Sequence, residues 1–232
     1  MDFPGSYVLP DSIYTTPKLK QYCNFGSTLN YKKGEAVFKP GDILNRLGYI
    51  LSGTVRVAMV SDDGQEQLLY TAGPGNLLGL LFGRKDEPTY VTALESCTIC
   101  FFTGEQIKAV CAHDPDVILE LLHNNIQKTG YFMSQLASRK WFSADIRILQ
   151  LIYHIALERG IYRDGRYEVN IKLTQKTISE ITGVHFVTVS RCLKQLKEMG
   201  IAEKVKNGFI IHDLERLNQL IESRMIDSKE EV

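Results

Sequence analysis

The segment Thr174–Leu196 reads TQKTISEITGVHFVTVSRCLKQL and predicts two short helices that meet at a tight turn. Thr174 is a good N-cap for the first helix, and Ile178 and Ile181 give that helix an apolar face. Gly183 falls where the chain must reverse, a position that favours a residue able to adopt a positive φ. A second apolar stripe follows, made of Val184, Val189, Leu193 and Leu196. This pattern is typical of a helix-turn-helix.

The polar residues of this segment suit contacts with double-stranded DNA. The second helix of such a motif fits the major groove, and its early residues reach base edges. Basic residues also gather between Lys172 and Lys206, although the whole chain has a formal net charge of +0, and clustered cations bind phosphate. The alternatives are a solvated helix face and an ordinary helical hairpin. The candidate DNA-binding residues are Thr174, Gln175, Lys176, His185, Val187, Thr188, Ser190, Arg191 and Lys194.

Two short strands are expected directly after the second helix. Ile201–Val205 and Phe209–Ile211 are β-prone and flank Asn207-Gly208, which is a strong hairpin turn signal. A hairpin in this place is typical of a wing. We therefore predict that Leu173–Met199, followed by this wing, binds DNA.

The first half of the chain predicts a β domain. Between Phe25 and Phe102, short runs rich in Val, Ile, Tyr, Leu and Thr alternate with Gly and Pro turn signals about every ten residues, which favours a barrel or sandwich over a parallel sheet. Asp62-Asp63-Gly64 is a hairpin signal between two of these runs. The expected strands are Tyr49–Leu51, Thr54–Val60, Gln67–Thr71 and Tyr90–Phe102.

From Pro115 the periodicity becomes helical. Apolar residues spaced i, i+3, i+4 predict a long helix over Pro115–Trp141 and a second helix over Ser143–Arg159. So long a helix favours pairing with a second copy, with intramolecular packing as the alternative. The predicted fold class is α+β, with a β-roll over residues 1–114, a dimerisation helix over 115–142 and a winged helix-turn-helix over 143–232.

Several function classes are not expected from this sequence. No apolar run approaches the ~20 residues of a membrane span, and the first residues do not form a leader, so a cytoplasmic protein is expected. The 5 cysteines are too few and too scattered for a disulfide framework. No phosphate-binding glycine loop, nucleophile elbow or His-Glu-x-x-His run is present, so an enzyme is not expected.

Together these features resemble the cyclic AMP receptor/FNR superfamily of bacterial transcription regulators. The resemblance covers nearly the whole chain: a glycine-punctuated β-roll, a long helix, a hinge and a winged helix that contains EITGVHFVTVSRCLKQL. It implies a homodimer whose long helices pair and an effector pocket between roll and helix. It also implies allosteric control of promoter DNA, most often as an activator that works with RNA polymerase, and no membrane partner.

The departures from the superfamily pattern narrow the effector. Cyclic-nucleotide members have Gly-Glu-Leu where this chain has Gly79-Leu80-Leu81, and a phosphate-binding arginine where it has Asp86-Glu87-Pro88-Thr89, so cyclic AMP is not expected. Only Cys23 lies near the start, which argues against an iron–sulfur cluster. Cys97 and Cys100 are expected to be buried strand residues, with a metal or redox site as the alternative. A haem site on His113 or His123 is a weaker alternative. No metal or other cofactor is predicted.

Within the superfamily the likeness is densest to the CprK-type regulators of halorespiration, around IRILQLIY, LTQKTISEITGVHFVTVSR and DGQEQLLYTAGPGNLLG. Those regulators sense halogenated phenolic acids, which implies that a lysine ammonium at Lys128 binds a phenolate. Leu80 stands where they have a lysine, so we expect a different aromatic effector. An exposed lysine and core tyrosines are the alternatives for these residues, and a redox- or haem-dependent regulator is the alternative function. The candidate effector-binding residues are Tyr70, Gly79, Leu80, Phe82, Tyr90, Thr92, Asn125 and Lys128.

One residue predicts the preferred DNA sequence. FNR-type recognition helices have a glutamate that accepts a hydrogen bond from cytosine, and Val187 occupies the corresponding position. A valine accepts no hydrogen bond but contacts a thymine methyl group. We therefore expect an A·T-rich inverted repeat, TTAAT-like, with half-sites about one helical turn apart.

Overall fold

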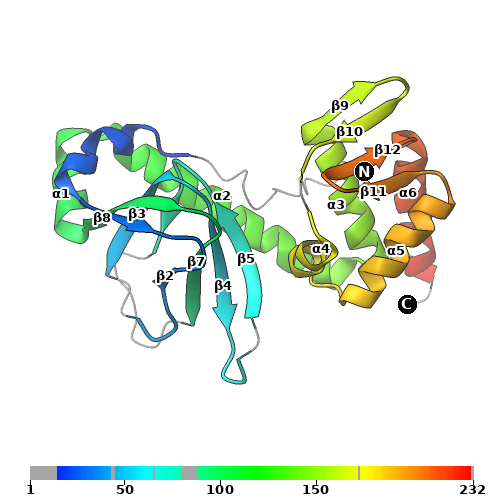
Figure 1. Cartoon of the computed structure of the whole chain (residues 1–232), viewed down its shortest axis with the longest axis horizontal. Coiled ribbons are helices and arrows are strands. Elements are labelled where there is room, and N and C mark those ends of the chain that lie inside the picture. The colour runs from blue at the N-terminus through cyan, green and yellow to red at the C-terminus, as the bar shows by residue number, and fades with distance from the viewer. Residues whose placement is uncertain (1–14, 43–44, 65, 80–87, 172, 231–232) are drawn as a thin grey trace. The chain divides into compact units, whose positions relative to one another are not determined.

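The computed structural model describes residues 15–42, 45–64, 66–79, 88–171 and 173–230. The chain forms two compact units, and the boundary between them falls between Gly130 and Tyr131, inside helix α2 (Asp116–Trp141). The first unit is built mainly of strands and the second mainly of helices, so the α+β class is confirmed (Figure 1).

The first unit contains the predicted β-roll, made of two four-stranded antiparallel sheets. One sheet has the order β1 (Ser27–Tyr31), β8 (Cys97–Thr103), β3 (Arg46–Ser52), β6 (Leu77–Leu78). The other has the order β2 (Ala36–Phe38), β7 (Thr89–Ala93), β4 (Val55–Val60), β5 (Glu66–Ala72). Apolar side chains such as Ile50, Ile99 and Phe102 are fully buried, because each strand turns one face to the core.

Three of the four predicted strands are confirmed in outline, the fourth is wrong, and β1, β2 and β6 were not predicted. β4 and β5 pair as a hairpin around Gly64, whose φ is +81°, as the Asp-Gly signal predicted. The run Tyr90–Phe102, however, is not one strand. It contains β7 and β8, which lie in different sheets and are separated by the exposed residues Leu94, Glu95 and Ser96. Continuous β propensity does not show where a chain leaves one sheet for another.

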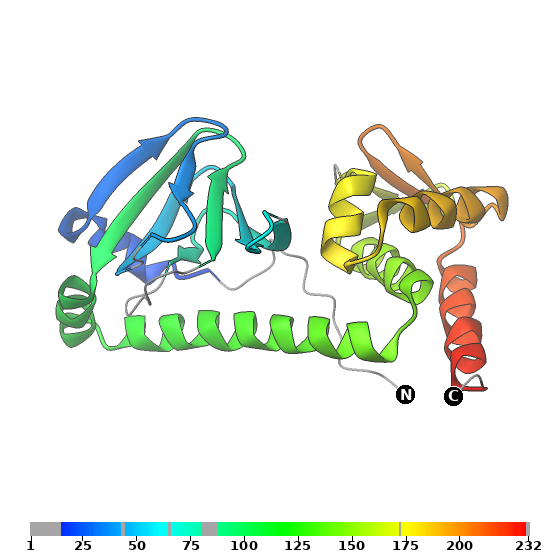
Figure 2. The same cartoon turned by 90° about the horizontal axis from the view of Figure 1, so that it is seen from below.

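Three helices pack against the roll: a 3-10 helix η1 (Lys18–Phe25), α1 (Gly104–His113) and the start of α2. Their side chains share one apolar cluster with the first sheet, which includes Leu19, Phe102, Ile107 and Val117. Figure 2 shows α2 as one continuous helix. Its observed range, Asp116–Trp141, agrees with the predicted one.

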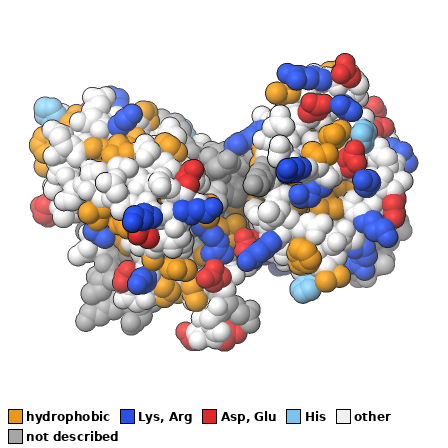
Figure 3. All heavy atoms as spheres, viewed as in Figure 1, with side chains coloured by type: hydrophobic (Ala, Val, Ile, Leu, Met, Phe, Trp, Pro, Cys, Tyr) orange, Lys and Arg blue, Asp and Glu red, His pale blue; other side chains and the backbone are white. Residues whose placement is uncertain are grey.

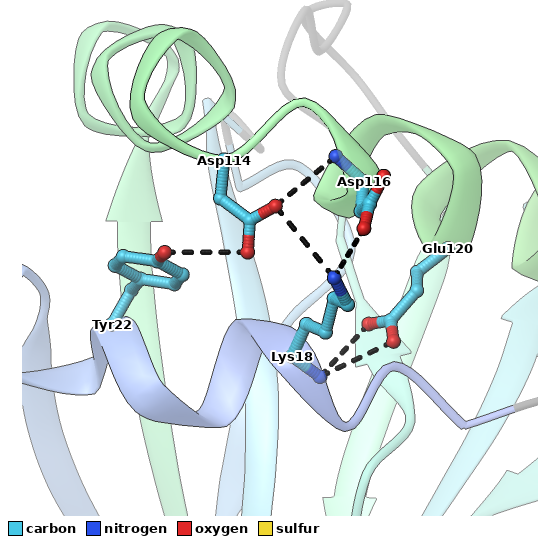
Figure 4. A network of polar contacts seen from close by, with 5 residues as sticks. All are labelled: Lys18, Tyr22, Asp114, Asp116 and Glu120. Carbon is cyan, nitrogen blue, oxygen red and sulfur yellow. Dashed lines mark hydrogen bonds and ion pairs between the residues drawn. The ribbon is translucent and has the colours of Figure 1, made fainter.

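A polar network fixes η1 to the first turns of α2 (Figure 4). The Lys18 backbone N–H donates to both carboxylate oxygens of Glu120, at 3.3 and 3.0 Å, and Glu120 is only 9% exposed. The Lys18 ammonium pairs with Asp114 at 3.8 Å and with Asp116, and the Tyr22 hydroxyl donates to Asp114 at 3.3 Å. These hydrogen bonds offset part of the cost of burying the Glu120 carboxylate. The network therefore holds the start of α2 against the roll.

The second unit is a winged helix-turn-helix, as predicted. Helix α3 (Ala144–Arg159) supplies most of its core, and α4 (Gln175–Thr182), α5 (Phe186–Glu198) and α6 (Leu214–Glu230) pack against it. Ser143 caps α3 and Gly160 follows its last residue, so the predicted ends of that helix are correct. The small sheet has the order β11 (Ala202–Val205), β12 (Gly208–Ile211), β10 (Arg166–Val169), β9 (Gly160–Arg163).

The hairpin of β9 and β10 was not predicted. Its turn residues, Asp164 and Gly165, both have positive φ, at 48° and 79°. This is the backbone of a type I′ turn, and an Asp-Gly pair between β-prone residues is its usual sequence signal. This signal is present in the sequence between Arg163 and Arg166.

Candidate DNA interface and effector site

The turn between α4 and α5 is fixed by backbone geometry and by hydrogen bonds. Thr174 Oγ1 accepts from Thr177 N at 3.0 Å, which caps α4. Gly183 is left-handed, with a φ of +62°, and its N–H donates to Ser179 O. Ser179 Oγ donates to Val184 O at 2.6 Å, and Arg147 Nη1 of α3 donates to Thr182 O at 2.7 Å. Because both ends of the turn are tied, the direction of α5 is set relative to α3 and α4.

Helix α5 presents a polar face opposite its buried one. Val189, Cys192, Leu193 and Leu196 are buried. Val187 is 62% exposed, and Arg191 and Lys194 are exposed at i+4 and i+7 from it, so the three lie on one face. Arg191 makes no side-chain hydrogen bond or ion pair with another described residue, which leaves its guanidinium free for an external acceptor.

The other candidate DNA-binding residues lie at the N-terminal ends of the two helices. Thr174 and Lys176 are exposed and Gln175 is partly buried at the start of α4, while Thr188 and Ser190 are partly buried on α5. His185 is the N-cap of α5, where its Nδ1 accepts from Val187 N at 3.4 Å. Phe186 is 48% exposed beside them and was not among the candidates. Figure 3 shows Lys and Arg side chains spread over the face of this unit that carries α5.

A stripe of exposed apolar residues runs along α2. Ile126, Met133 and Leu136 are 66%, 65% and 69% exposed, which is unusual for large apolar side chains. Leu119, Leu122, Ile126, Met133 and Leu136 are separated by intervals of 3, 4, 7 and 3 residues, which is the heptad spacing of a two-stranded coiled coil. This spacing favours pairing with the same helix of a second copy.

Lys128 occupies the opposite side of α2 and is largely buried against the roll. Its ammonium donates to Leu77 O at 2.8 Å and lies 5.4 Å from the centre of the Tyr70 ring. Burial lowers the pKa of Lys128 to about 8 and raises the pKa of Tyr70, which is 8% exposed, to about 12. No described acidic residue pairs with Lys128, so this buried cation is held by a carbonyl dipole and a ring face alone.

The structure brings together some of the predicted effector residues and separates others. Gly79 directly follows β6, has a φ of +78°, and lies so close to Arg46 O that a Cβ would approach that oxygen to 2.7 Å. Only glycine fits there without displacing the strand. Leu80 and Phe82 lie outside the described residues.

Tyr90, Thr92 and Asn125 complete the expected effector set. Tyr70, Val57 and Val91 form one row across β5, β4 and β7. Tyr90 and Thr92 flank Val91, and because side chains alternate along a strand, they point to the opposite face from Tyr70. Asn125 is exposed and lies three residues before Lys128 on α2. Asn124, four residues before Lys128, is 2% exposed, so it is the more buried of these two helix neighbours of Lys128.

The cysteines have structural environments. Cys97 Sγ donates to Thr54 O and Glu95 O, at 3.3 and 3.2 Å, and Cys100 Sγ donates to Cys23 O at 3.4 Å. Burial raises the pKa of Cys23 to about 12, which disfavours a reactive thiolate. Among the described residues, all cysteines are free, and no group of three or more His, Cys, Asp or Glu side chains is placed to hold a metal. His113 and His123 are exposed.

No helix among the described residues has the length and hydropathy needed to cross a bilayer.

Both units of the chain match known protein families. Residues 28–114 match the cyclic nucleotide-binding domain family, and residues 146–220 match the Crp-like helix-turn-helix domain family. A solved structure of CprK complexed with OCPA is similar at a TM-score of 0.84 and 35% identity, over 89% of this chain and 96% of that one. A variant of CooA from Carboxydothermus hydrogenoformans shares the fold at a TM-score of 0.77 and 19% identity, over 87% and 90% of the two chains. The anaerobic regulatory protein of Pasteurella multocida (strain Pm70) is 28% identical over 193 residues, which are 82% of this chain and 70% of that protein.

Proposed function

Because the chain belongs to the cyclic AMP receptor/FNR family of transcription regulators, we propose that it controls promoter DNA in response to a small anionic aromatic effector. In this proposal it binds an A·T-rich inverted repeat as a homodimer, through α5, and acts as an activator together with RNA polymerase. The observation that carries the effector class is the buried ammonium of Lys128, which has no described acidic partner.

The DNA side of the proposal rests on the exposed face of α5. Arg191 and Lys194 supply donors for guanine edges or phosphates, and Val187 supplies a methyl contact in place of a hydrogen-bond acceptor. Binding-site selection with the full chain is expected to return an inverted repeat with A·T pairs at the position that faces Val187. A strong G·C preference at that position in each half-site would refute the proposed operator.

The effector side rests on charge. A cation that is removed from water loses its solvation, and a bound anion can compensate for that loss. Among the described residues, the Lys128 ammonium contacts only the Leu77 carbonyl and the Tyr70 ring, so an anionic ligand would stabilise it. A halogen lowers the pKa of a phenol, so a halogenated phenol presents a phenolate near neutral pH whereas the parent phenol does not. The related CprK was solved in complex with o-chlorophenolacetic acid. That acid has a carboxylate in addition to its phenol group. Because this chain has Leu80 where CprK-type regulators have a lysine, we expect an effector without this carboxylate.

Two measurements test this class of effector. Thermal unfolding is followed with chlorinated phenols, with o-chlorophenolacetic acid and with the unchlorinated parents, since a ligand that binds only the folded chain raises its Tm. Fluorescence anisotropy then measures binding of the selected DNA with each compound. We expect chlorinated phenols to raise both the Tm and the DNA affinity, and the Lys128→Met variant to lose both responses. A Soret or iron–sulfur absorption band in anaerobically purified protein would instead establish the haem or redox alternative.

A further inference from the structure

The winged-helix unit contains a cleft that the proposed function does not use. It has a volume of about 460 Å³ and opens between α3, the β9–β10 hairpin and the start of α6. The residues that carry its chemistry are Tyr153, Tyr162, Tyr167, His212, Asp213 and Glu215. Neither α4 nor α5 contributes to its lining, so the cleft is separate from the candidate DNA-binding residues.

Aromatic rings form one side of the cleft. The Tyr162 and Tyr167 rings lie 5.1 Å apart between centroids and are tilted by 59°, one on each strand of the hairpin. Tyr153 of α3 adds a third ring to the lining. Tyr162 on strand β9 remains 63% exposed, although a large aromatic side chain gains little from contact with water. The face of an aromatic ring carries negative charge density and attracts a cation.

Carboxylates form the other side. Asp213 Oδ1 accepts from Arg216 N at 2.8 Å, which caps α6 and leaves the second carboxylate oxygen available. Glu215, exposed in the first turn of α6, is the second acidic residue of the lining. Among the described residues no Lys or Arg lines the cleft, and the Arg216 guanidinium donates to Met199 O at 3.2 Å. The cleft is thus acidic, although it lies in the unit that is expected to bind the DNA polyanion.

The volume of the cleft, its aromatic side chains and its carboxylates all favour the same class of ligand. A volume of about 460 Å³ suits a small molecule rather than a metal ion or a folded partner. Aromatic faces next to carboxylates favour a cation whose charge is spread over alkyl groups, because such a cation is weakly hydrated and loses little when it leaves water. A phosphate or carboxylate ligand would be repelled by Asp213 and Glu215.

We propose that this cleft is a binding site for a small organic ammonium ion, held between the Tyr162 and Tyr167 rings and the carboxylates of Asp213 and Glu215. The site is independent of Lys128 and of the aromatic effector, and its ligand has the opposite charge.

Choline and its neutral isostere 3,3-dimethylbutan-1-ol are the probes. They have nearly the same shape and differ in charge, so a site that selects the cation binds choline more tightly. Saturation-transfer NMR and isothermal titration of the full chain, without DNA or aromatic compounds, measure both affinities. We expect choline to bind about two- to five-fold more tightly than the neutral alcohol, the effect of one exposed cation–π contact.

Variants locate the binding. Tyr162→Leu removes one ring, and Asp213→Asn removes a charge while keeping an oxygen that caps α6. Each is expected to weaken choline binding about two- to five-fold. The matched controls are Phe186→Leu and Glu198→Gln, which change an exposed ring and a carboxylate of α5 outside the cleft, and they should bind as the parent does. Absence of choline binding, equal binding of the neutral alcohol, or unchanged binding in both cleft variants would overturn the proposal. None of these outcomes affects the proposed response to an aromatic anion, which is measured separately.

Discussion

Replacing Lys128 with methionine tests whether this lysine is a buried cation kept for a ligand. Methionine has a similar length and no charge, so it fills the same space beside Tyr70 and leaves out the ammonium. Burial lowers the pKa of Lys128 from 10.5 to about 8. The folded chain therefore releases this proton more readily than the unfolded chain does, and protonation at neutral pH destabilises the fold.

The magnitude follows from proton linkage. With a folded pKa of about 8 and an unfolded value of 10.5, the protonated lysine costs about 3 kcal/mol of unfolding free energy at pH 7. The cost falls as the pH rises, because the unfolded chain holds the proton up to a higher pH. Between pH 7 and pH 9 the parent should gain about 1.3 kcal/mol relative to the variant. The Lys128→Met variant also loses the hydrogen bond to Leu77 O, which lowers its unfolding free energy by about 1 to 3 kcal/mol. This loss offsets part of the stability gained by removing the charge, but it does not depend on pH.

The difference in pH dependence is therefore the decisive measurement. Denaturant unfolding of the parent and of Lys128→Met is compared at pH 7, 8 and 9, with the exposed residue change Lys33→Met as the control. We expect the unfolding free energy of the parent to rise by about 1.3 kcal/mol relative to that of Lys128→Met between pH 7 and pH 9. The control variant should show the same pH dependence as the parent. Parallel pH profiles for the parent and the Lys128→Met variant would refute the buried-cation argument.

Further changes test the other features. Gly183→Ala should lower the unfolding free energy by about 1 kcal/mol and weaken DNA binding, because its φ is +62° and the new Cβ would lie 3.2 Å from the Arg139 guanidinium. Gly104 has open space around it, so Gly104→Ala is the control and should leave stability unchanged in denaturant unfolding. Val187→Glu should shift the selected half-site toward a G·C pair at one position by about ten-fold or more in relative affinity, and unchanged selection would contradict the role given to Val187. Ile126→Lys should convert a dimer to a monomer by sedimentation velocity without unfolding it, since the side chain is 66% exposed, whereas Met59→Lys on the roll should remain dimeric.

The sequence by itself determined the local elements. The helix-turn-helix, its glycine at φ +62°, the wing and the long helix all follow from patterns within a few residues: apolar periodicity, an N-cap threonine and a turn glycine. The exposed face of α5 could also be identified, because the helical period places Val187, Arg191 and Lys194 on one side once Val189 and Leu193 are assigned to the core.

Only the tertiary structure decided which residues meet across the roll. Lys128 and Tyr70 are 58 positions apart, and no local pattern shows that a lysine on a helix is buried on a ring of β5. Strand register separated Tyr90 and Thr92 from Tyr70, because a shift of one residue exchanges the two faces of a strand. The aromatic cleft of the winged helix depends in the same way on a hairpin turn, a helix and a loop being folded together. Periodicity along a chain fixes which face a side chain occupies, whereas contacts between distant segments depend on how whole elements pack.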